Sequence, residues 1–215
     1  MVGETVPILT VVAVEAGLMF RSDEPIWYVH PETDQQRIFY GDLVLARPVD
    51  PRRVTADDLL LAMEVVSTHD RRKALKDTLF QRLLNEYNDV PEFALLFPDL
   101  EDPRALTWYR LVEEGRYEEQ IVAPGGRVSS RAVPELELRV LPRDRWSPGY
   151  KVDIYYRGEL RPRMAAVLQR AGEEKARADE EKARAEKEKA RAEKEKARAD
   201  RLAERLRELG IDNDH

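Results

Sequence analysis

The organisation of this chain is clearest in residues 59–97, which read LLLAMEVVSTHDRRKALKDTLFQRLLNEYNDVPEFALLF. Residues 59–66 are apolar on both faces apart from Glu64, a pattern typical of a strand buried in the middle of a sheet. Residues 71–87 carry leucines at helical spacing, and residues 93–97 form a second apolar run. A strand, an amphipathic helix and a strand in this order predict a βαβ crossover.

Shorter apolar segments on either side of this crossover predict further strands. They lie at residues 26–29, 43–46, 106–112, 116–121 and 136–141. Glu114-Gly115 is a predicted hairpin turn. Residues 1–20 are apolar in patches, and we expect them to be strand as well. The sequence therefore predicts an α/β fold in which a mixed β-sheet is flanked by helices.

The overall composition limits the kinds of site that the chain can build. Its 215 residues suit one compact domain with an extension, and they include no cysteine. This excludes disulfides, cysteine-ligated zinc and a thiol nucleophile, and it fits a reducing, cytoplasmic setting. His30, His69 and His215 are too scattered to suggest a histidine-rich metal site. No apolar run reaches the roughly 18 residues that would span a membrane.

The composition changes abruptly near residue 160. From Arg163 onward the chain has no aromatic residue and no proline, and it soon enters the seven-residue repeat EEKARAD-EEKARAE-KEKARAE-KEKARAD. We therefore expect a globular domain over residues 1–160 and a long charged α-helix over residues 161–215. Pro162 suits the first position of this helix, and Gly210 suits its C-terminal cap.

The repeat leaves the role of the charged helix open. The alanines of each copy lie on different sides of a helix, so they form no continuous apolar seam. Leu202, Leu206 and Leu209 have coiled-coil spacing, but only at the very end. A solvated single helix and a weak coiled coil both fit. Direct nucleic-acid contact is disfavoured because the 13 basic and 12 acidic residues of 173–209 nearly cancel.

Three residues of the globular part could carry chemistry together. Glu64 interrupts a buried strand, where an unpaired carboxylate is costly, so it must pair, reach solvent or bind a cation. Asp42 precedes another predicted strand, and Lys76, with Lys73 as its rival, lies on the predicted helix. Taken singly, each also has an ordinary explanation as a strand-end acid, an ion-pair partner or a solvated helix lysine.

Together, two carboxylates on adjacent strands and a nearby lysine suit phosphodiester hydrolysis. Carboxylate oxygens are the ligands that Mg²⁺ takes from proteins, and it keeps several waters besides. Such an ion polarises a phosphate and lowers the pKa of a bound water. A lysine can orient that water or stabilise the charge that develops on phosphorus. The expected site therefore has Asp42 and Glu64 as Mg²⁺ ligands and Lys76 beside them.

The order of these motifs resembles the restriction-endonuclease family best known for its many cyanobacterial copies, within the PD-(D/E)XK nuclease superfamily. The similarity runs through Asp42, the Glu-Val-Val-Ser of residues 64–67, Lys76, which lies four residues before an aromatic one, and the Val-Pro-Glu-Phe of residues 90–93. Many members also end in a charged helical tail, and this chain closes with Leu-Arg-Glu-Leu-Gly-Ile at 206–211.

The resemblance implies a fold, an activity and a site. It implies a restriction-endonuclease-like mixed sheet flanked by helices and metal-dependent cleavage of DNA. Asp42 and Glu64 would ligate Mg²⁺, and Lys76 would be the catalytic lysine. In the wider superfamily a lysine stands two residues after the glutamate, but Val66 occupies that place here, so a helix lysine has to supply the ammonium group. We also expect the chain to act as a homo-oligomer.

The distribution of charge keeps other functions open. The net charge is −6, and outside residues 173–209 there are 23 basic and 30 acidic residues. Proteins that bind nucleic acid through general phosphate contacts are usually basic, so DNA binding would need a local patch, the metal or an oligomer. The main alternative is a catalytically inactive nuclease fold that serves as an oligomerisation or interaction module through its C-terminal helix. A hydrolase for another phosphodiester is a third possibility.

Overall fold

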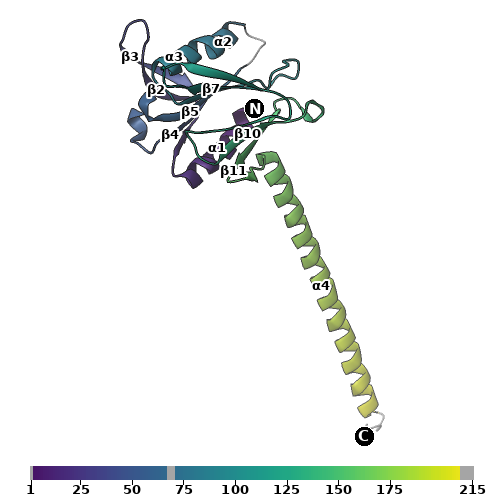
Figure 1. Cartoon of the computed structure of the whole chain (residues 1–215). Coiled ribbons are helices and arrows are strands. Elements are labelled where there is room, and N and C mark those ends of the chain that lie inside the picture. The colour runs from purple at the N-terminus through teal and green to yellow at the C-terminus, as the bar shows by residue number, and fades with distance from the viewer. Residues whose placement is uncertain (1, 67–70, 209–215) are drawn as a thin grey trace. The chain divides into compact units, whose positions relative to one another are not determined.

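The computed structural model describes residues 2–66 and 71–208, and it divides into two units, Met1–Met164 and Ala165–His215 (Figure 1). In chain order the elements are α1 (Val2–Ala16), β1 (Met19–Arg21), β2 (Glu24–Val29), β3 (Gln36–Gly41), β4 (Leu43–Ala46), η1 (Pro51–Arg53), η2 (Ala56–Asp58), β5 (Leu59–Val65), α2 (Arg71–Leu75), η3 (Lys76–Phe80), α3 (Gln81–Tyr87), β6 (Glu92–Leu96), β7 (Leu106–Leu111), β8 (Tyr117–Val122), β9 (Arg127–Ser129), β10 (Leu136–Val140), η4 (Arg143–Arg145), β11 (Val152–Tyr156), β12 (Glu159–Leu160) and α4 (Met164–Glu208).

The centre of the first unit is a mixed six-stranded sheet in the order β1-β4-β5-β6-β7-β8. β5 and β6 run parallel, and the other neighbouring pairs are antiparallel. The predicted α/β class and the βαβ crossover are therefore confirmed, as are the strands expected at 26–29, 43–46, 59–66 and 93–97. The predicted turn at Glu114-Gly115 joins β7 to β8, with Gly115 in the left-handed region at φ 68°.

The two faces of this sheet are covered differently, as Figure 1 shows. On one face, Leu61, Met63 and Val65 of β5 belong to a large apolar cluster. This cluster also includes residues of α1 and of a second sheet, whose strand order is β12-β11-β10-β9. The other face carries Ala62 and Val66, which cluster with Leu84 of α3 and Ile26 of the β2–β3 hairpin. Consecutive residues of a strand point to opposite faces, so Glu64 belongs to the helix-and-hairpin side.

The expectation that residues 1–20 form strand is wrong, because Val2–Ala16 is helical. Ile8, Leu9, Val12 and Ala13 are buried one helical turn apart and pack against the sheet. The helix ends at Gly17, at φ 67°, where the Gly17 amide donates to the Val14 carbonyl at 3.2 Å and the Leu18 amide to the Ala13 carbonyl at 2.8 Å. The β-branched composition suggested strand, but packing of one face on the sheet favours the helix.

The predicted helix over residues 71–87 is confirmed as three continuous segments, but of its leucines only Leu84 is buried, while Leu75, Leu79 and Leu83 are exposed. α2 and α3 are joined by η3, a π-helical segment in which the Gln81 amide donates to the Lys76 carbonyl. A π turn takes up an extra residue and shifts the phase of the helix. As a result Asp77 and Asn85 are buried, whereas Leu79 is exposed although its spacing is that of a core residue.

The predicted C-terminal helix is confirmed as α4, which is 45 residues long (Figure 1). It starts at Met164, so Pro162 is not its first residue as we expected. The residues before the helix are held by the globular unit: the Arg161 guanidinium pairs with Glu15, and Arg163 lies over the Tyr150 ring. The expected cap at Gly210 lies outside the described residues. Across the described helices, none combines the length and apolar character needed to cross a membrane.

Candidate active site

The pairing of β4 with β5 brings Asp42 and Glu64 together. The strands are antiparallel with Leu43 opposite Met63, so Asp42, just before β4, lies beside Glu64 in β5. The Asp42 amide donates to Oε1 of Glu64 at 3.3 Å, and the Val65 amide donates to Oδ2 of Asp42 at 2.8 Å. Each carboxylate therefore accepts a backbone hydrogen bond from the segment that carries the other one.

Gly41 leaves room for this arrangement. It is the last residue of β3 and is buried. A Cβ atom added here would lie 3.3 Å from Cγ1 of Val44 and 3.7 Å from Oε1 of Glu64, closer to the valine than side-chain atoms usually come. A glycine before Asp42 thus lets the β3–β4 connection pass directly over the Glu64 carboxyl.

The helix on this face contributes a third carboxylate, which the sequence did not point to. Asp77, the second residue of η3, is buried with 1% of its surface exposed, and its charge acts on Glu64. Lys76, the predicted catalytic lysine, precedes it and is exposed, but its charge also acts on Glu64. The structure thus brings Asp42 and Glu64 together, whereas Lys76 lies exposed on the helix of the same side and acts on Glu64 only through its charge. The side chain of the rival Lys73 lies outside the described residues.

A row of polar side chains continues from Asp77 along the buried side of the helix. The Gln81 amide nitrogen donates to the Tyr40 carbonyl at 3.2 Å, and the Tyr28 hydroxyl donates to Oδ1 of Asn85 at 3.0 Å. Asn88 exchanges two hydrogen bonds with the backbone of Val29, at 2.8 and 2.9 Å. These contacts fix the helix against the β2–β3 hairpin and orient Asp77 towards the sheet. Asp77, Gln81 and Asn85 stand four residues apart, but the leucine spacing pointed to another side of the helix as the buried one, so nothing in the sequence singled out Asp77.

Glu64 is in an environment that disfavours its charge. Only 4% of its surface is exposed, and this burial raises its pKa well above the ordinary value. The Asp42 and Asp77 carboxylates raise it further, while the hydrogen bond from the Asp42 amide and the charge of Lys76 lower it. Burial also raises the pKa of Tyr28, and the charge of Glu64 adds to that effect. Two buried acids, Glu64 and Asp77, and the part-buried Asp42 thus act on one another electrostatically, and their negative charge is favourable for an added cation.

The fit of this group to a metal ion is partial. Within residues 2–66 and 71–208, no three His, Asp or Glu side chains gather as a group that could hold an ion. The donors present are carboxylates, however, and Mg²⁺ is often held by one or two carboxylates, with waters completing its shell. Asp42 and Glu64 meet that smaller requirement, and the repulsion between them is what a bound cation would relieve.

Glu92 is a buried carboxylate with a structural role, and its partners differ from those of Glu64. It begins β6 and is almost fully buried. It accepts from Nε of Arg110 at 3.2 Å, from the Arg131 amide at 3.0 Å and from the Ser130 hydroxyl, so it anchors the turn after β9 to the sheet. The charges that raise the pKa of Glu64, in contrast, are those of two other acids, Asp42 and Asp77.

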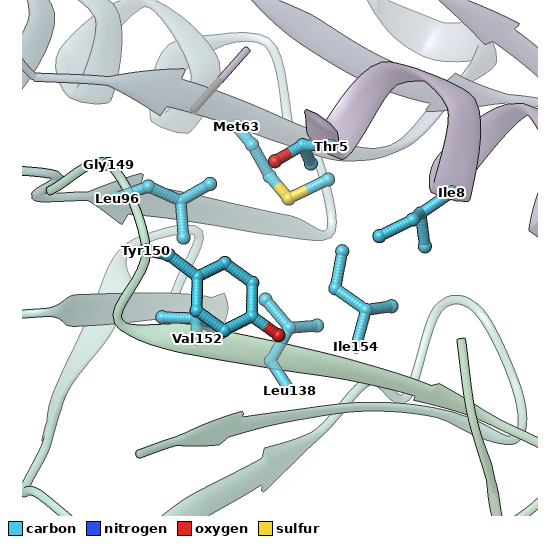
Figure 2. A pocket seen from close by; sticks show the side chains of 9 residues that line it. All are labelled: Thr5, Ile8, Met63, Leu96, Leu138, Gly149, Tyr150, Val152 and Ile154. Atoms are coloured by element: carbon cyan, nitrogen blue, oxygen red, sulfur yellow. The ribbon is translucent and has the colours of Figure 1, made fainter. Parts of the chain in front are cut away.

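A small, mostly apolar cavity lies on the opposite face of the sheet. Figure 2 shows Met63 and Leu96 of the central sheet, Ile8 of α1 and Ile154 of β11 surrounding it. Its volume is about 20 Å³, enough for roughly one water-sized sphere. Because Met63 and Glu64 are consecutive in β5, this cavity is separated from the carboxylates by the sheet itself. It is a packing defect of the core and not part of the candidate active site.

Comparison with known proteins adds no assignment, since the sequence matches no family model and no curated protein. Ser67 and His69, which follow Glu64 along the chain, lie outside the described residues. The candidate site is therefore defined by Asp42, Glu64, Lys76 and Asp77.

Proposed function

We propose that this chain is a Mg²⁺-dependent DNA endonuclease of the PD-(D/E)XK class, with a restriction-endonuclease-like fold. The observation that carries the proposal is the pairing of Asp42 with Glu64 at one position of the β4–β5 ladder, with Lys76 acting on the same carboxyl. The mixed sheet with helices on both faces agrees with the architecture that the family resemblance implies.

Asp42 and Glu64 would hold the ion, and Asp77 would add negative charge behind them. When bound, Mg²⁺ supplies Lewis-acid polarisation of the phosphate and a more acidic water. The backbone amides of Asp42 and Val65 fix one oxygen of each carboxylate, so the carboxylates are held in place before any ligand arrives. Such preorganisation avoids reorganisation at the moment of reaction.

Lys76 would act on the phosphate from the helix. It is exposed while Asp77, its neighbour, is buried, so the π turn directs one charged side chain outward and the next one inward. An ammonium group at the mouth of an acidic site can stabilise charge on the scissile phosphate or orient the attacking water. This replaces the lysine that the superfamily has at the position of Val66.

Contact with DNA would come from a local surface, since the chain as a whole has a net charge of −6. Trp27, Gln36, Arg52, Arg53 and Thr55 line an open hollow between β2 and η1. Arginine side chains pair with phosphates and an exposed indole can stack on a base, so this hollow is suited to a nucleic-acid strand.

Cleavage of supercoiled plasmid DNA with Mg²⁺ or Mn²⁺ tests the proposal. We expect nicking by the wild-type chain, none by Glu64→Ala, and normal nicking by Glu118→Ala, which removes an exposed strand glutamate. Calorimetry should show divalent-ion binding that Glu64→Ala abolishes. If wild type binds no divalent ion and cuts no DNA, the nuclease proposal fails and the interaction module acting through α4 replaces it. Cleavage of RNA or nucleotides alone would instead support another phosphodiesterase.

A further inference from the structure

Every side chain of α4 that the structure describes is exposed. These are the side chains of residues 172–196 and 198–205, a stretch of about nine helical turns at 3.6 residues per turn. Most helices in proteins are stabilised by an apolar face that packs on another element. No described side chain of α4 is buried in this way, so the helix has to be stabilised by pairs of its own side chains.

Acidic and basic side chains alternate in sign along one stripe of α4, at every step of three or four residues. This charged stripe consists of Glu173, Arg177, Glu181, Arg184, Glu188, Arg191, Glu195 and Arg198. Residues at this spacing are neighbours on the surface of a helix, and opposite charges there stabilise it. Nε of Arg191 lies 3.1 Å from Oε1 of Glu195, which is a formed pair of the stripe. Each inner member has an opposite charge on both sides, so a pair that opens on one side can form again on the other.

The repeat offers no apolar seam to a partner helix. A coiled coil needs apolar residues at alternating intervals of three and four. The alanines of the repeat recur every seven residues, and the seam positions between them are charged. Between Ala176 and Ala183, for example, the seam would pass through Asp179 or Glu180. A two-stranded seam would therefore bury a charged side chain at every second position, which is costly.

We propose that α4 is a self-supporting single helix that serves as a stiff spacer, with pairing along the charged stripe in place of a partner helix. Charged helical sequences of this type act as semi-rigid spacers. Over the 27 residues from Ala176 to Ala203, a rise of about 1.5 Å per residue gives about 40 Å, whereas a flexible chain of that length spans about 29 Å. The spacer keeps whatever is attached at one end of the repeat at a set distance from the other end. This function goes beyond the proposed nuclease activity and does not depend on it.

A distance between two spin labels in the full chain tests the spacer. The chain has no cysteine, so Ala176→Cys combined with Ala203→Cys provides the only two labelled positions. Pulsed electron paramagnetic resonance, with the labelled chain diluted in an excess of unlabelled chain, reports the distance within one molecule. We expect a narrow distribution centred near about 40 Å. A broad distribution centred near about 29 Å would overturn the proposal.

A single label in the middle of the repeat tests whether α4 needs a second helix. In a two-stranded coiled coil the helix axes lie about 8–10 Å apart, so labels on Ala190→Cys of the two chains would come within about 30 Å of each other. We expect the undiluted, singly labelled chain to show no intermolecular distance in that range. Such a distance would overturn the proposal and identify α4 as a coiled coil.

Two matched double variants, carrying the same two labels, test whether the charged stripe stabilises the helix. Arg177→Glu with Arg184→Glu places acids beside acids along the stripe, and like charges at this spacing destabilise a helix. Lys187→Glu with Lys194→Glu changes the net charge equally, but both of these lysines stand three and four residues from arginines. We expect the first variant to shift from about 40 Å towards about 29 Å and the second to keep the longer distance. Equal distributions in the two variants would contradict the role of the charged stripe and overturn the proposal.

Discussion

The amide of Val65 donates a hydrogen bond of 2.8 Å to Oδ2 of Asp42, and the amide of Asp42 donates in turn to the Glu64 carboxyl. The two acids are thus positioned by backbone groups of β4 and β5, and not by flexible side chains. Their separation should change little when neighbouring side chains are replaced, which allows their charges to be altered one at a time.

Asp42→Asn should remove activity without unfolding the protein. The amide oxygen can still accept from Val65, but the side chain no longer offers a negative charge to a cation. We expect nicking to fall by at least ~100-fold, the scale of losing one preorganised charged group in an active site. The thermal midpoint should stay within a few degrees of wild type. Unchanged nicking would remove Asp42 from the site.

Glu64→Gln should be more stable than wild type at high pH. The pKa of Glu64 is raised in the folded protein, so the folded state keeps this proton over a range in which the unfolded chain has lost it. Stability therefore falls as the pH rises from the ordinary glutamate value towards the raised one, and glutamine avoids that loss. At pH 8 without divalent ions we expect a gain of roughly 2–4 °C, the shift that about 1 kcal/mol causes in a protein of this size.

Calorimetric scans of wild type and Glu64→Gln from pH 4 to pH 8 would follow this effect. The difference between them should shrink towards pH 4, where both carboxyl and amide are neutral. Glu118→Gln, at an exposed position, should match wild type throughout. A Glu64→Gln variant that is less stable at pH 8 would mean that the charged carboxylate has an ion-pair role instead.

Replacing each of the two candidate lysines in turn should identify the one that assists cleavage. We expect Lys76→Met to lower the cleavage rate by about 10²–10⁴-fold, the usual range for a group that assists proton transfer or charge stabilisation. Lys76→Arg should recover part of that loss, since it restores the positive charge. Lys73→Met serves as the matched variant one helical turn earlier. If Lys73→Met is the damaging change, the assignment moves to Lys73.

Trp27 and the two arginines beside it should govern DNA binding. Trp27 is partly exposed, whereas Trp108 is fully buried, so an oligonucleotide that stacks on Trp27 should quench the exposed part of the fluorescence. Arg52→Ala combined with Arg53→Ala should weaken binding and reduce the slope of log K against log salt by about 2. These titrations are done without divalent ions. Quenching that persists in Trp27→Phe would exclude this hollow as the DNA-binding surface.

Lys151 should be one of the largest single contributors to stability outside the site. It is fully buried, and its ammonium group donates to the carbonyls of Asp102 and Arg104 at 2.7 and 2.9 Å and lies over the Trp146 ring. Lys151→Met leaves two carbonyls without this donor, so we expect a loss of about 2–4 kcal/mol in urea unfolding. Lys187→Met, on the exposed surface of α4, should change stability by less than about 0.5 kcal/mol.

The parts of the fold that were predictable are those where burial alone determines the pattern. β5 and β6 are apolar on both faces because they lie in the middle of the sheet, and α4 is long and uniform in composition. α1 was mistaken for strand because its β-branched residues outweighed the cap at Gly17. β3 escaped prediction because its residues are mostly exposed and show no clear alternation, whereas β11 was missed although its residues alternate between buried and part exposed.

The candidate site was predictable only in part. Glu64 could be foreseen because a carboxylate inside a buried apolar strand is costly unless it is paired or binds a cation, and Asp42 because it precedes the neighbouring strand. Asp77 could not, because a regular α-helix through residues 71–87 would have turned the leucines inward. The π segment at Lys76–Phe80 alters the phase, and nothing in the local composition announces such a turn.

Met63 and Glu64 point to opposite faces of β5, so the two faces of the central sheet have different roles. The side of Met63 is covered by α1 and the second sheet and holds the larger of the two buried apolar clusters. The side of Glu64 has its own apolar cluster around Ile26, Leu84 and Phe93, so the acids beside it can be exchanged while both clusters remain. A protein built in this way can acquire a new specificity, or lose its chemistry altogether, while its backbone stays the same.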